Sequence, residues 1–356
     1  MTLIDGRFRI DGTILGWERD GLFHATDSEG RGYLVSMLDH HPPRFDDVLG
    51  NRRFDAPGCA RLVFAKPDVD GLDIVVEEEP SGRASRFAPP LPPSAARSAA
   101  LGLARWVNSG LGIDAGLPPE LVYLDGEQLA GVAPRFFALR RSRNMTRAGG
   151  YSWFSPYMTS GATSNREDDA YAIGMLLRFW LTGAPPFTLA FESPMQFMVA
   201  VFKHEFLFRY EGPLRDAIDA CVAGDLSRAT NLLVSAKVDR AAEAMRARLI
   251  GEVVAQPGDD GPRLVLADWL LEREDPRGEL IQLQCRHAIA PSPALAARAD
   301  QLIAEHGVRW SAYLLPEARD PVFERGFVAR VATDNPEALH QRSDALRAHG
   351  PLPVIV

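Results

Sequence analysis

Residues 150–187 read GYSWFSPYMTSGATSNREDDAYAIGMLLRFWLTGAPPF, and the fold of the chain depends on this stretch. Near its middle, Ser164 is followed three residues later by Glu167. This spacing is a capping-box pattern, in which two side chains satisfy free backbone N–H groups at the start of a helix. It predicts a helix that begins at about Asn165.

The predicted helix should be buried on every side. From Ala170 to Leu181 the residues are apolar on nearly every face, and only Arg178 is strongly polar. A surface helix would keep one polar face, so this pattern is typical of a helix inside a core. Gly183 and the pair Pro185 and Pro186 should end it, because glycine favours the left-handed cap and proline cannot continue a helix. Such a helix forms the centre of a large domain.

The composition is that of an ordinary globular protein. The chain has 356 residues, of which 46% are hydrophobic and 24% charged, and this length suffices for two domains. Its formal net charge of −8 argues against general binding to nucleic acid or to an anionic membrane. We therefore expect neither among its partners.

The cysteines and the N-terminus indicate the cytoplasm. Cys59, Cys221 and Cys285 are odd in number, far apart and in no C-x-x-C pair, which suits a reduced compartment without disulfides or a zinc site. The first residues show no basic segment followed by an apolar run, so no signal peptide is expected. No run of about 18 apolar residues occurs, so no transmembrane helix is expected either.

Three blocks of the opening stretch resemble the activation-segment end and the central buried helix of bacterial Ser/Thr protein kinases. WFSPY at 153–157 stands where that family has Y-M-[AS]-P-E, and DAYAIG at 169–174 stands where it has D-V-Y-[AS]-L-G. LTGAPPF at 181–187 matches L-T-G-x-P-P-F, with the right spacing between blocks. The resemblance implies an α+β fold, namely a bilobal kinase-like domain over residues 7–236.

Residues 7–38 alternate as strands separated by glycine turns. In the kinase resemblance, the glycine-rich phosphate loop falls at residues 15–23, where Gly16 and Gly21 remain but Glu18 replaces the middle glycine. Such a loop binds phosphate through bare backbone N–H groups, and a carboxylate beside it would repel the anion. Two glycines in a hairpin are by themselves more often a plain turn than a phosphate-binding loop. We therefore treat the loop as vestigial.

The family pattern G-R-x-V-A-V-K-x-L appears here as GRGYLVSML at residues 30–38, so Ser36 stands at the phosphate-pairing lysine. A neutral hydroxyl cannot supply the ammonium that holds the α- and β-phosphates. Glu77–Glu79 would form the interlobe hinge, where three carboxylates would not favour a nucleotide. The alternative for these three residues is a solvated charge run.

The catalytic positions are also replaced. IDAGLPPELVYLD at 113–125 lies on the family's H-R-D-L-K-P-x-N-[IV]-L-L-D, which puts Gly116 at the catalytic aspartate and Leu121 at the metal-binding asparagine. The metal-binding aspartate of D-F-G falls at Val132. Magnesium needs oxygen ligands, which these positions lack. We expect no catalytic residue, metal or cofactor, although a shifted Asp114 remains as an alternative base.

Two arginine features follow from the same alignment. Arginines cluster where an activation loop would lie, either as a phosphate-recognising or partner-docking patch or as a solvated loop. Their positions are Arg140, Arg141, Arg143 and Arg147. Arg228 takes the place of the family's structural arginine and is expected to pair with a carboxylate of the lobe.

A second domain is predicted over residues 237–356. PRLVLADWLLEREDPRGELIQLQ at 262–284 has the periodicity of two helices joined by an Asp-Pro-Arg-Gly turn. It resembles the repeat-companion domain of large bacterial proteins, whose pattern is R-L-V-x-A-D-W-L-E-E-R-G-D-P-R-G-E-[FL]-I-x-L-Q. That domain accompanies leucine-rich or similar repeats and carries no catalytic activity. The resemblance implies a mainly helical domain that ends in short strands.

The last residues, PLPVIV at 351–356, look like the first strand of a repeat array, so the end is expected to be a capping module with no solenoid behind it. Val354 and Ile355 would then lie on an uncovered strand edge, which is a template for pairing with another chain. The expected partner is a protein, either repeat-bearing or a second copy. Alternatively, Pro351 and Pro353 blunt the edge.

Together these patterns predict a pseudokinase that serves as a binding or scaffolding module in bacterial signalling. The alternative is an atypical ATP-dependent phosphotransferase or nucleotidyltransferase that uses displaced residues. Fold by itself does not confer activity, so the replaced residues favour the first interpretation.

Overall fold

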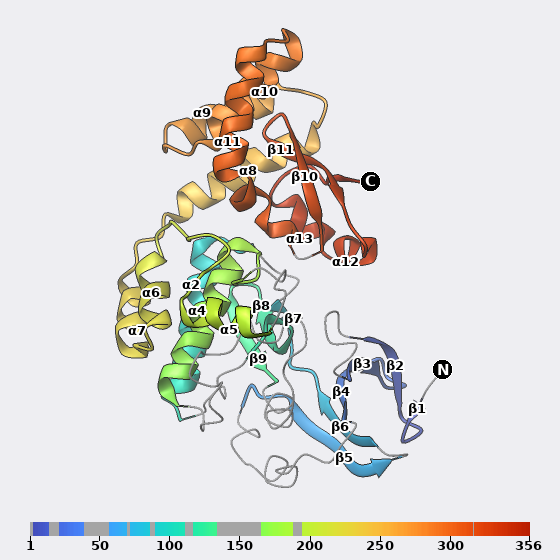
Figure 1. The fold of residues 1–356 in the computed structure, drawn as a ribbon. Coiled ribbons are helices and arrows are strands. Elements are labelled where there is room, and N and C mark those ends of the chain that lie inside the picture. The colour runs from blue at the N-terminus through green and yellow to red at the C-terminus, as the bar shows by residue number, and fades with distance from the viewer. Residues whose placement is uncertain are drawn as a thin grey trace.

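The computed structural model describes residues 3–13, 21–38, 57–69, 72–85, 90–110, 117–133, 165–187, 194–315 and 317–356. Figure 1 shows a sheet-rich N-terminal lobe, a group of helices beside it, and a C-terminal part in which helices accompany a small sheet. This arrangement confirms the predicted α+β fold class, with a sheet lobe followed by a helical lobe. None of the described helices is long and apolar enough to cross a membrane.

The N-terminal lobe is built on an antiparallel sheet of six strands in the order β1-β2-β3-β4-β6-β5. The strands are β1 (Leu3–Ile4), β2 (Phe8–Thr13), β3 (Leu22–Thr26), β4 (Gly32–Leu38), β5 (Arg61–Val69) and β6 (Leu72–Glu78). The strands expected between residues 7 and 38, and the one leading to the hinge, are present. The last of these extends through Glu77 and Glu78, so two of the three hinge glutamates belong to β6.

Both faces of the central strands are covered, which is why β4 is buried at four consecutive residues, from Tyr33 to Ser36. On one face, Tyr33 and Val35 pack in a small cluster with Phe8, Ile74 and Val76. On the other face, Leu22 and Leu34 join the large cluster of the helical lobe. A strand buried on both faces reads as a continuous apolar run and not as an alternating one.

The helical lobe surrounds α4, as the sequence predicts. Its helices are α2 (Pro93–Asn108), α4 (Arg166–Thr182), α5 (Pro194–Phe202), α6 (Arg215–Val222) and α7 (Leu226–Ser235). Every residue of α4 from Asp168 to Trp180 is buried, Arg178 included. Gly174 lets α6 approach, since a Cβ there would lie 2.6 Å from that of Cys221. Gly183 ends the helix in the left-handed conformation at φ 73°.

The start of α4 differs by one residue from the prediction. Asn165 is the N-cap, and its side chain accepts hydrogen bonds from the N–H groups of Glu167 and Asp168. The Asp168 carboxylate accepts from the Asn165 N–H at 3.0 Å, which completes the capping box. The predicted pair Ser164 and Glu167 is therefore wrong. Asparagine is at least as good an N-cap as serine, and an aspartate at the third helical position can close the box.

A small antiparallel sheet, ordered β7-β8-β9, lies between the two lobes (Figure 1). Its strands are β7 (Arg83–Ala84), β8 (Val122–Asp125) and β9 (Gln128–Val132), and the short helix η3 (Pro119–Leu121) precedes β8. The inner end of β9 also contacts the N-terminal lobe. The Val132 N–H donates to the Gly58 carbonyl and the Ala60 N–H donates to the Val132 carbonyl, both at 2.8 Å.

The C-terminal part is mainly helical and ends in short strands. Its elements are α8 (Arg240–Ala255), α9 (Gly261–Leu271), α10 (Arg277–Ile289), α11 (Pro293–Ser311), η6 (Ala312–Leu314), β10 (Arg319–Glu324), β11 (Phe327–Ala332), α12 (Pro336–Gln341), α13 (Ser343–Arg347) and β12 (Val354–Ile355). β10 and β11 form a hairpin whose two loop residues, Arg325 and Gly326, have φ of 50° and 81°. Positive φ at both residues is the signature of a type I′ turn.

Specific polar contacts join the C-terminal part to the helical lobe. Ser94 at the start of α2 donates twice to the Glu243 carboxylate on α8, from its N–H at 2.9 Å and its hydroxyl at 2.6 Å. Arg240 lies 2.8 Å from the Glu127 carboxylate. Gly183 fits against Tyr313, because a Cβ there would lie 2.7 Å from the Tyr313 backbone. These contacts fix α8 and η6 against the helical lobe.

Candidate functional site

The kinase positions of the sequence fall partly within the described chain. Gly16, Gly116 and the arginine cluster Arg140, Arg141, Arg143 and Arg147 lie outside the described residues. Gly21 is the residue before β3, with φ of 68°, and its carbonyl accepts from the Met37 N–H at 2.7 Å. In the structure Gly21 therefore continues the hydrogen bonding between β3 and β4. Its positive φ is a backbone conformation that glycine adopts readily.

Ser36 occupies an interior position of the sheet. It lies on β4 between Leu22 of β3 and Val75 of β6, and its side chain is only 2% exposed. A serine hydroxyl is one heavy atom from Cβ, so it cannot reach into an interlobe space as a lysine ammonium does. The position at which the resemblance expects a cation is a neutral, enclosed site.

Leu121 and Val132, the two positions at which the sequence alignment expects metal ligands, lie side by side. The Ala133 N–H donates to the Leu121 carbonyl at 2.9 Å, and Val122 pairs with Val132 across the β8–β9 ladder. Both side chains are fully buried in the large hydrophobic cluster. Within the described ranges, no group of three or more His, Cys, Asp or Glu side chains is arranged to hold a metal ion.

The inner face of the sheet continues into the same cluster. Leu22 is 1% and Leu34 is 2% exposed, and both belong to one contiguous set of buried side chains with Leu121 and Val132. Apolar side chains of both lobes therefore pack as one core at the level of β3, β4 and β9. A ligand between the lobes at this level would have to displace packed side chains.

The hinge carboxylates take part in contacts between elements. One oxygen of Glu79 lies 2.8 Å from Nδ1 of His24 on β3, and the Tyr123 hydroxyl on β8 donates to the same oxygen at 3.0 Å. Burial, followed by the nearby Glu79 charge, raises the pKa of Tyr123 well above its ordinary value. Glu77 is only 2% exposed. The alternative of a solvated charge run is therefore wrong for Glu77, because β6 is covered on both faces.

Sequence reasoning missed the His24–Glu79–Tyr123 contact. The three residues come from separate stretches, and none belongs to a motif. The strand register contains a partial signal: His24 pairs with Leu34, which pairs with Glu77, so His24 and Glu77 share one sheet face, and Glu79 follows Glu77 by two residues. The sequence alone does not give that register.

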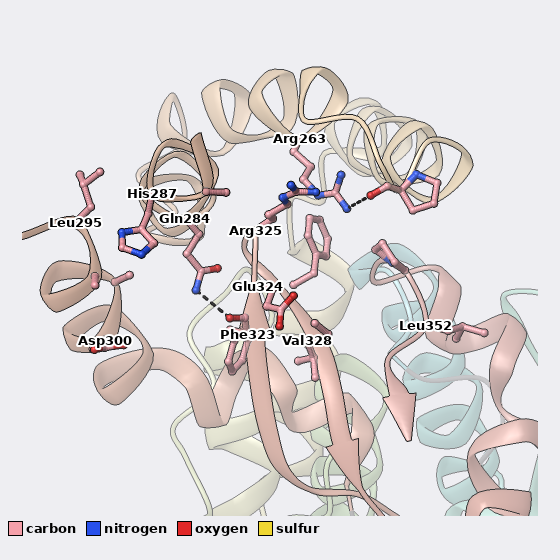
Figure 2. A pocket seen from close by; sticks show the side chains of 17 residues that line it. Arg263, Gln284, His287, Leu295, Asp300, Phe323, Glu324, Arg325, Val328 and Leu352 are labelled. Carbon is pink, nitrogen blue, oxygen red and sulfur yellow. Dashed lines mark hydrogen bonds between the residues drawn. The ribbon is translucent and has the colours of Figure 1, made fainter. Parts of the chain in front are cut away.

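The C-terminal part contains a cavity of about 680 Å³ between α10, α11 and the β10–β11 hairpin (Figure 2). Gln284 spans its floor, donating to the Phe323 carbonyl at 3.0 Å and accepting from the Gly326 N–H at 2.7 Å. At one end, Arg263 donates to the carbonyls of Pro257 and Asp259, and Arg325 faces the Asp260 carboxylate at 3.3 Å. These polar groups hold loops within the fold.

The predicted partner strand β12 lies at a sheet edge, parallel to β11 in the order β10-β11-β12. Val354 and Ile355 are 62% and 45% exposed, and the Val356 N–H donates to the Val331 carbonyl at 2.9 Å. No further strand among the described residues pairs with the outer side of β12. The predicted geometry is confirmed, whereas the role of this edge in binding stays a prediction.

Arg228 does not have the predicted role. Its side chain is exposed on α7, and it forms no ion pair with any described residue. Its backbone N–H instead donates to the Asp225 cap at 2.9 Å.

Comparisons with known proteins add little. No family model matches the chain, and no curated protein matches it. Among solved structures, the chain is similar to one described as the crystal structure of Rad53 kinase domain and SCD2 in complex with AMPPNP. The two are 18% identical, and the match covers 65% of this chain and 90% of the other with a TM-score of 0.42. A likeness this distant carries no argument on activity, ligands or partners.

Proposed function

We propose that this chain is a catalytically inactive kinase-like protein that serves as a protein-binding or scaffolding module in bacterial signalling. The observation that supports this most directly is the burial of Ser36, Leu121 and Val132. These residues stand at the positions of the kinase lysine, asparagine and metal-binding aspartate, and they are 2%, 0% and 0% exposed.

Phosphoryl transfer depends on electrostatics more than on covalent chemistry. The lysine and the metal ions neutralise the charge on the phosphates, and the metal ions need carboxylate or amide oxygens. A serine and two apolar side chains inside a hydrophobic core provide neither. A chain of this kind would bind Mg–ATP poorly and would not transfer its phosphate.

The space in which a kinase holds the adenine is also relevant. Leu22 and Leu34 pack in one buried cluster with residues of the helical lobe, and Glu79 of the hinge is engaged by His24 and Tyr123. Both features favour a closed interlobe contact that holds the two lobes together without a nucleotide. This supports a structural, partner-binding role.

The organisation that we propose is a kinase-like domain over residues 7–236 and a repeat-companion domain over residues 237–356. The contacts between Ser94 and Glu243 would hold the two as one unit. We place this unit in the cytoplasm, because Cys221 and Cys285 are buried as thiols, which suits a reduced compartment.

A phosphotransfer assay tests the proposal. Purified full-length chain is incubated with labelled ATP, Mn²⁺ and generic protein substrates, alongside Asp114→Asn and Asp125→Asn variants. We expect no incorporation by any of the three. Incorporation that disappears in either variant would contradict the proposal and would establish the alternative phosphotransferase with displaced residues. Incorporation that survives both variants points to a contaminating kinase and is checked by repeating the purification.

A further inference from the structure

Arg178 is a buried cation near the end of α4. The residue is only 2% exposed, and one Nη atom of its side chain donates a hydrogen bond to the Phe208 carbonyl. The guanidinium lies against two aromatic rings, with its central carbon 4.6 Å from the centroid of Phe206 and 5.1 Å from that of Phe208. The rings and the carbonyl orient the group but do not neutralise its charge.

No carboxylate of the described chain forms an ion pair with Arg178. Burial lowers its pKa to about 10, so the group is still protonated at neutral pH. A charge taken out of water is costly unless a counter-charge compensates it. A buried arginine without one is therefore a feature that requires an explanation.

A cavity of about 380 Å³ adjoins this arginine, between the end of α4, residues 204–210 and α6. Its other cations already have partners. Arg215 lies 2.6 Å from Glu211 and 3.7 Å from Asp219, and Arg209 lies 3.6 Å from Glu211. Of the arginines that line the cavity, Arg178 is thus the one whose charge the described residues leave unmatched.

Aromatic and apolar side chains also line the cavity. The Phe206 ring lies parallel to the His204 ring, with 5.9 Å between centroids and 4° between planes. Tyr210, Ile218 and Val222 belong to the same lining. Burial lowers the pKa of His204, so that ring is neutral at physiological pH and adds no positive charge. Flat rings of this kind favour a planar ligand in stacked or edge contact.

We propose that this cavity binds a small aromatic monocarboxylate, with the carboxylate at Arg178 and the ring against Phe206 and Tyr210. A guanidinium fork matches the planar, bidentate geometry of a carboxylate. One unmatched positive charge fits one negative charge. Glu205 and Asp219 also line the cavity and would repel a dianion such as a phosphate ester. The volume lies at the lower end of the roughly 300–1,000 Å³ range of ligand pockets, which suits a ligand of one or two rings.

The site goes beyond the proposed function and does not depend on it. It belongs to the helical lobe, and none of the kinase positions Ser36, Leu121 or Val132 lines it. A ligand here would contact α4 and α6, which both contribute buried side chains to the core of the lobe. The inactive kinase-like module would then bind a small molecule at a site unrelated to ATP.

The first experiment uses the full chain and three probes that share one phenyl ring. Benzoate carries one negative charge, benzamide is its neutral isostere, and phenyl phosphate is a dianion. Binding is followed by calorimetry and by ligand-detected NMR. We expect saturable, one-to-one binding of benzoate and at least about tenfold weaker binding of benzamide and phenyl phosphate, because a lost charge-assisted hydrogen bond weakens affinity by about that factor. Equal binding of benzoate and benzamide, or no saturable binding of benzoate, would overturn the proposal.

Variants then locate the site. Arg178→Gln should reduce benzoate affinity at least about tenfold, whereas the control Arg248→Gln removes an arginine that is 63% exposed on α8, outside the cavity lining, and should leave it nearly unchanged. If Arg178→Gln does not fold, Tyr210→Ala is used in its place and should weaken benzoate binding through loss of the ring contact. Benzoate affinity that survives both Arg178→Gln and Tyr210→Ala, or the folded one of the two, contradicts the site.

Discussion

The carboxylate of Glu243 caps helix α2 from another part of the chain. Both donors of Ser94, its N–H and its hydroxyl, reach this carboxylate at 2.9 and 2.6 Å. Helix α2 has Pro92 at its N-cap, which forms no side-chain cap of its own, and it has no acidic residue in its first turn. Glu243 therefore supplies from α8 the negative charge that a helix N-terminus favours.

The first prediction concerns this contact. Glu243→Ala should lower the free energy of unfolding by about 1–2 kcal/mol, because it removes an N-terminal cap and leaves the Ser94 donors unsatisfied. Urea denaturation of the full chain measures the effect. The control is Arg240→Ala, which breaks only the exposed pair with Glu127 and should cost less than about 1 kcal/mol. Equal effects of the two variants would mean that Glu243 is only a surface charge.

The second prediction concerns α4. Ile173 and Leu177 are both fully buried in the large cluster. Either one changed to Ala should cost about 2–5 kcal/mol of unfolding free energy, as is usual when a core side chain is deleted and a cavity remains. Val234→Ala is the matched control, since Val234 is 60% exposed on α7. Near-normal melting of the double variant would show that α4 is not the centre of the lobe.

The third prediction is a pH dependence. Burial, followed by the charges of Arg246 and Arg277, lowers the pKa of His349 from 6.5 to about 3; Arg342 acts in the same direction, and the Pro90 backbone opposes it. The unfolded chain takes up this proton below about pH 6.5, whereas the folded chain does not until about pH 3. Unfolding therefore binds a proton in between, and the free energy of unfolding should fall as pH falls through this window.

Replacement of His349 by Phe tests this assignment, because the ring stacked at 4.9 Å on Tyr313 is kept while the titrating group is lost. Urea denaturation at about pH 7 and about pH 5 should show a smaller loss of stability in His349→Phe than in the original chain. If both lose the same amount, the acid sensitivity has another origin.

The fourth prediction concerns the β12 edge. A second copy of the chain is one of the two partners that the sequence leads us to expect at this edge. If the edge pairs with it, Val354→Lys should shift the chain toward monomer in sedimentation, because a lysine on an edge strand opposes strand pairing. Ile289→Lys replaces another apolar residue, 79% exposed on α10, and should leave the mass unchanged. An assembly that Val354→Lys does not alter would contradict self-association through β12.

The sequence predicts the elements whose signals are local. We observe, as expected, the apolar run in α4, its glycine end and the two helices around the Asp-Pro-Arg-Gly turn. Hydrophobic periodicity and the residues that start or stop a helix are signals within a few neighbouring residues, so the sequence alone shows them. The N-cap of α4 is Asn165 and not the predicted Ser164. The pairs Ser164–Glu167 and Asn165–Asp168 have the same spacing, and only the backbone geometry selects between them.

The parts that the sequence did not predict are relations between distant residues. Ser94 and Glu243 are 149 positions apart, and Glu79 is bound by residues from two other strands. Arg178 is the single strongly polar residue in the apolar part of α4. The residues that cover its side chain, Phe206 and Phe208, come from a later segment of the chain, so the helix pattern alone does not reveal them. The kinase positions could be located by alignment, but their enclosure in a common core follows only from the packing of both lobes.

The most direct test of the central claim is the melting temperature of the full chain with ATP, in the presence and absence of Mg²⁺. A ligand that binds the folded state raises the melting temperature by mass action. Because Ser36, Leu121 and Val132 offer no cation and no metal ligand, the account predicts no rise that requires Mg²⁺. A rise with Mg–ATP that is lost when Mg²⁺ is removed would contradict it.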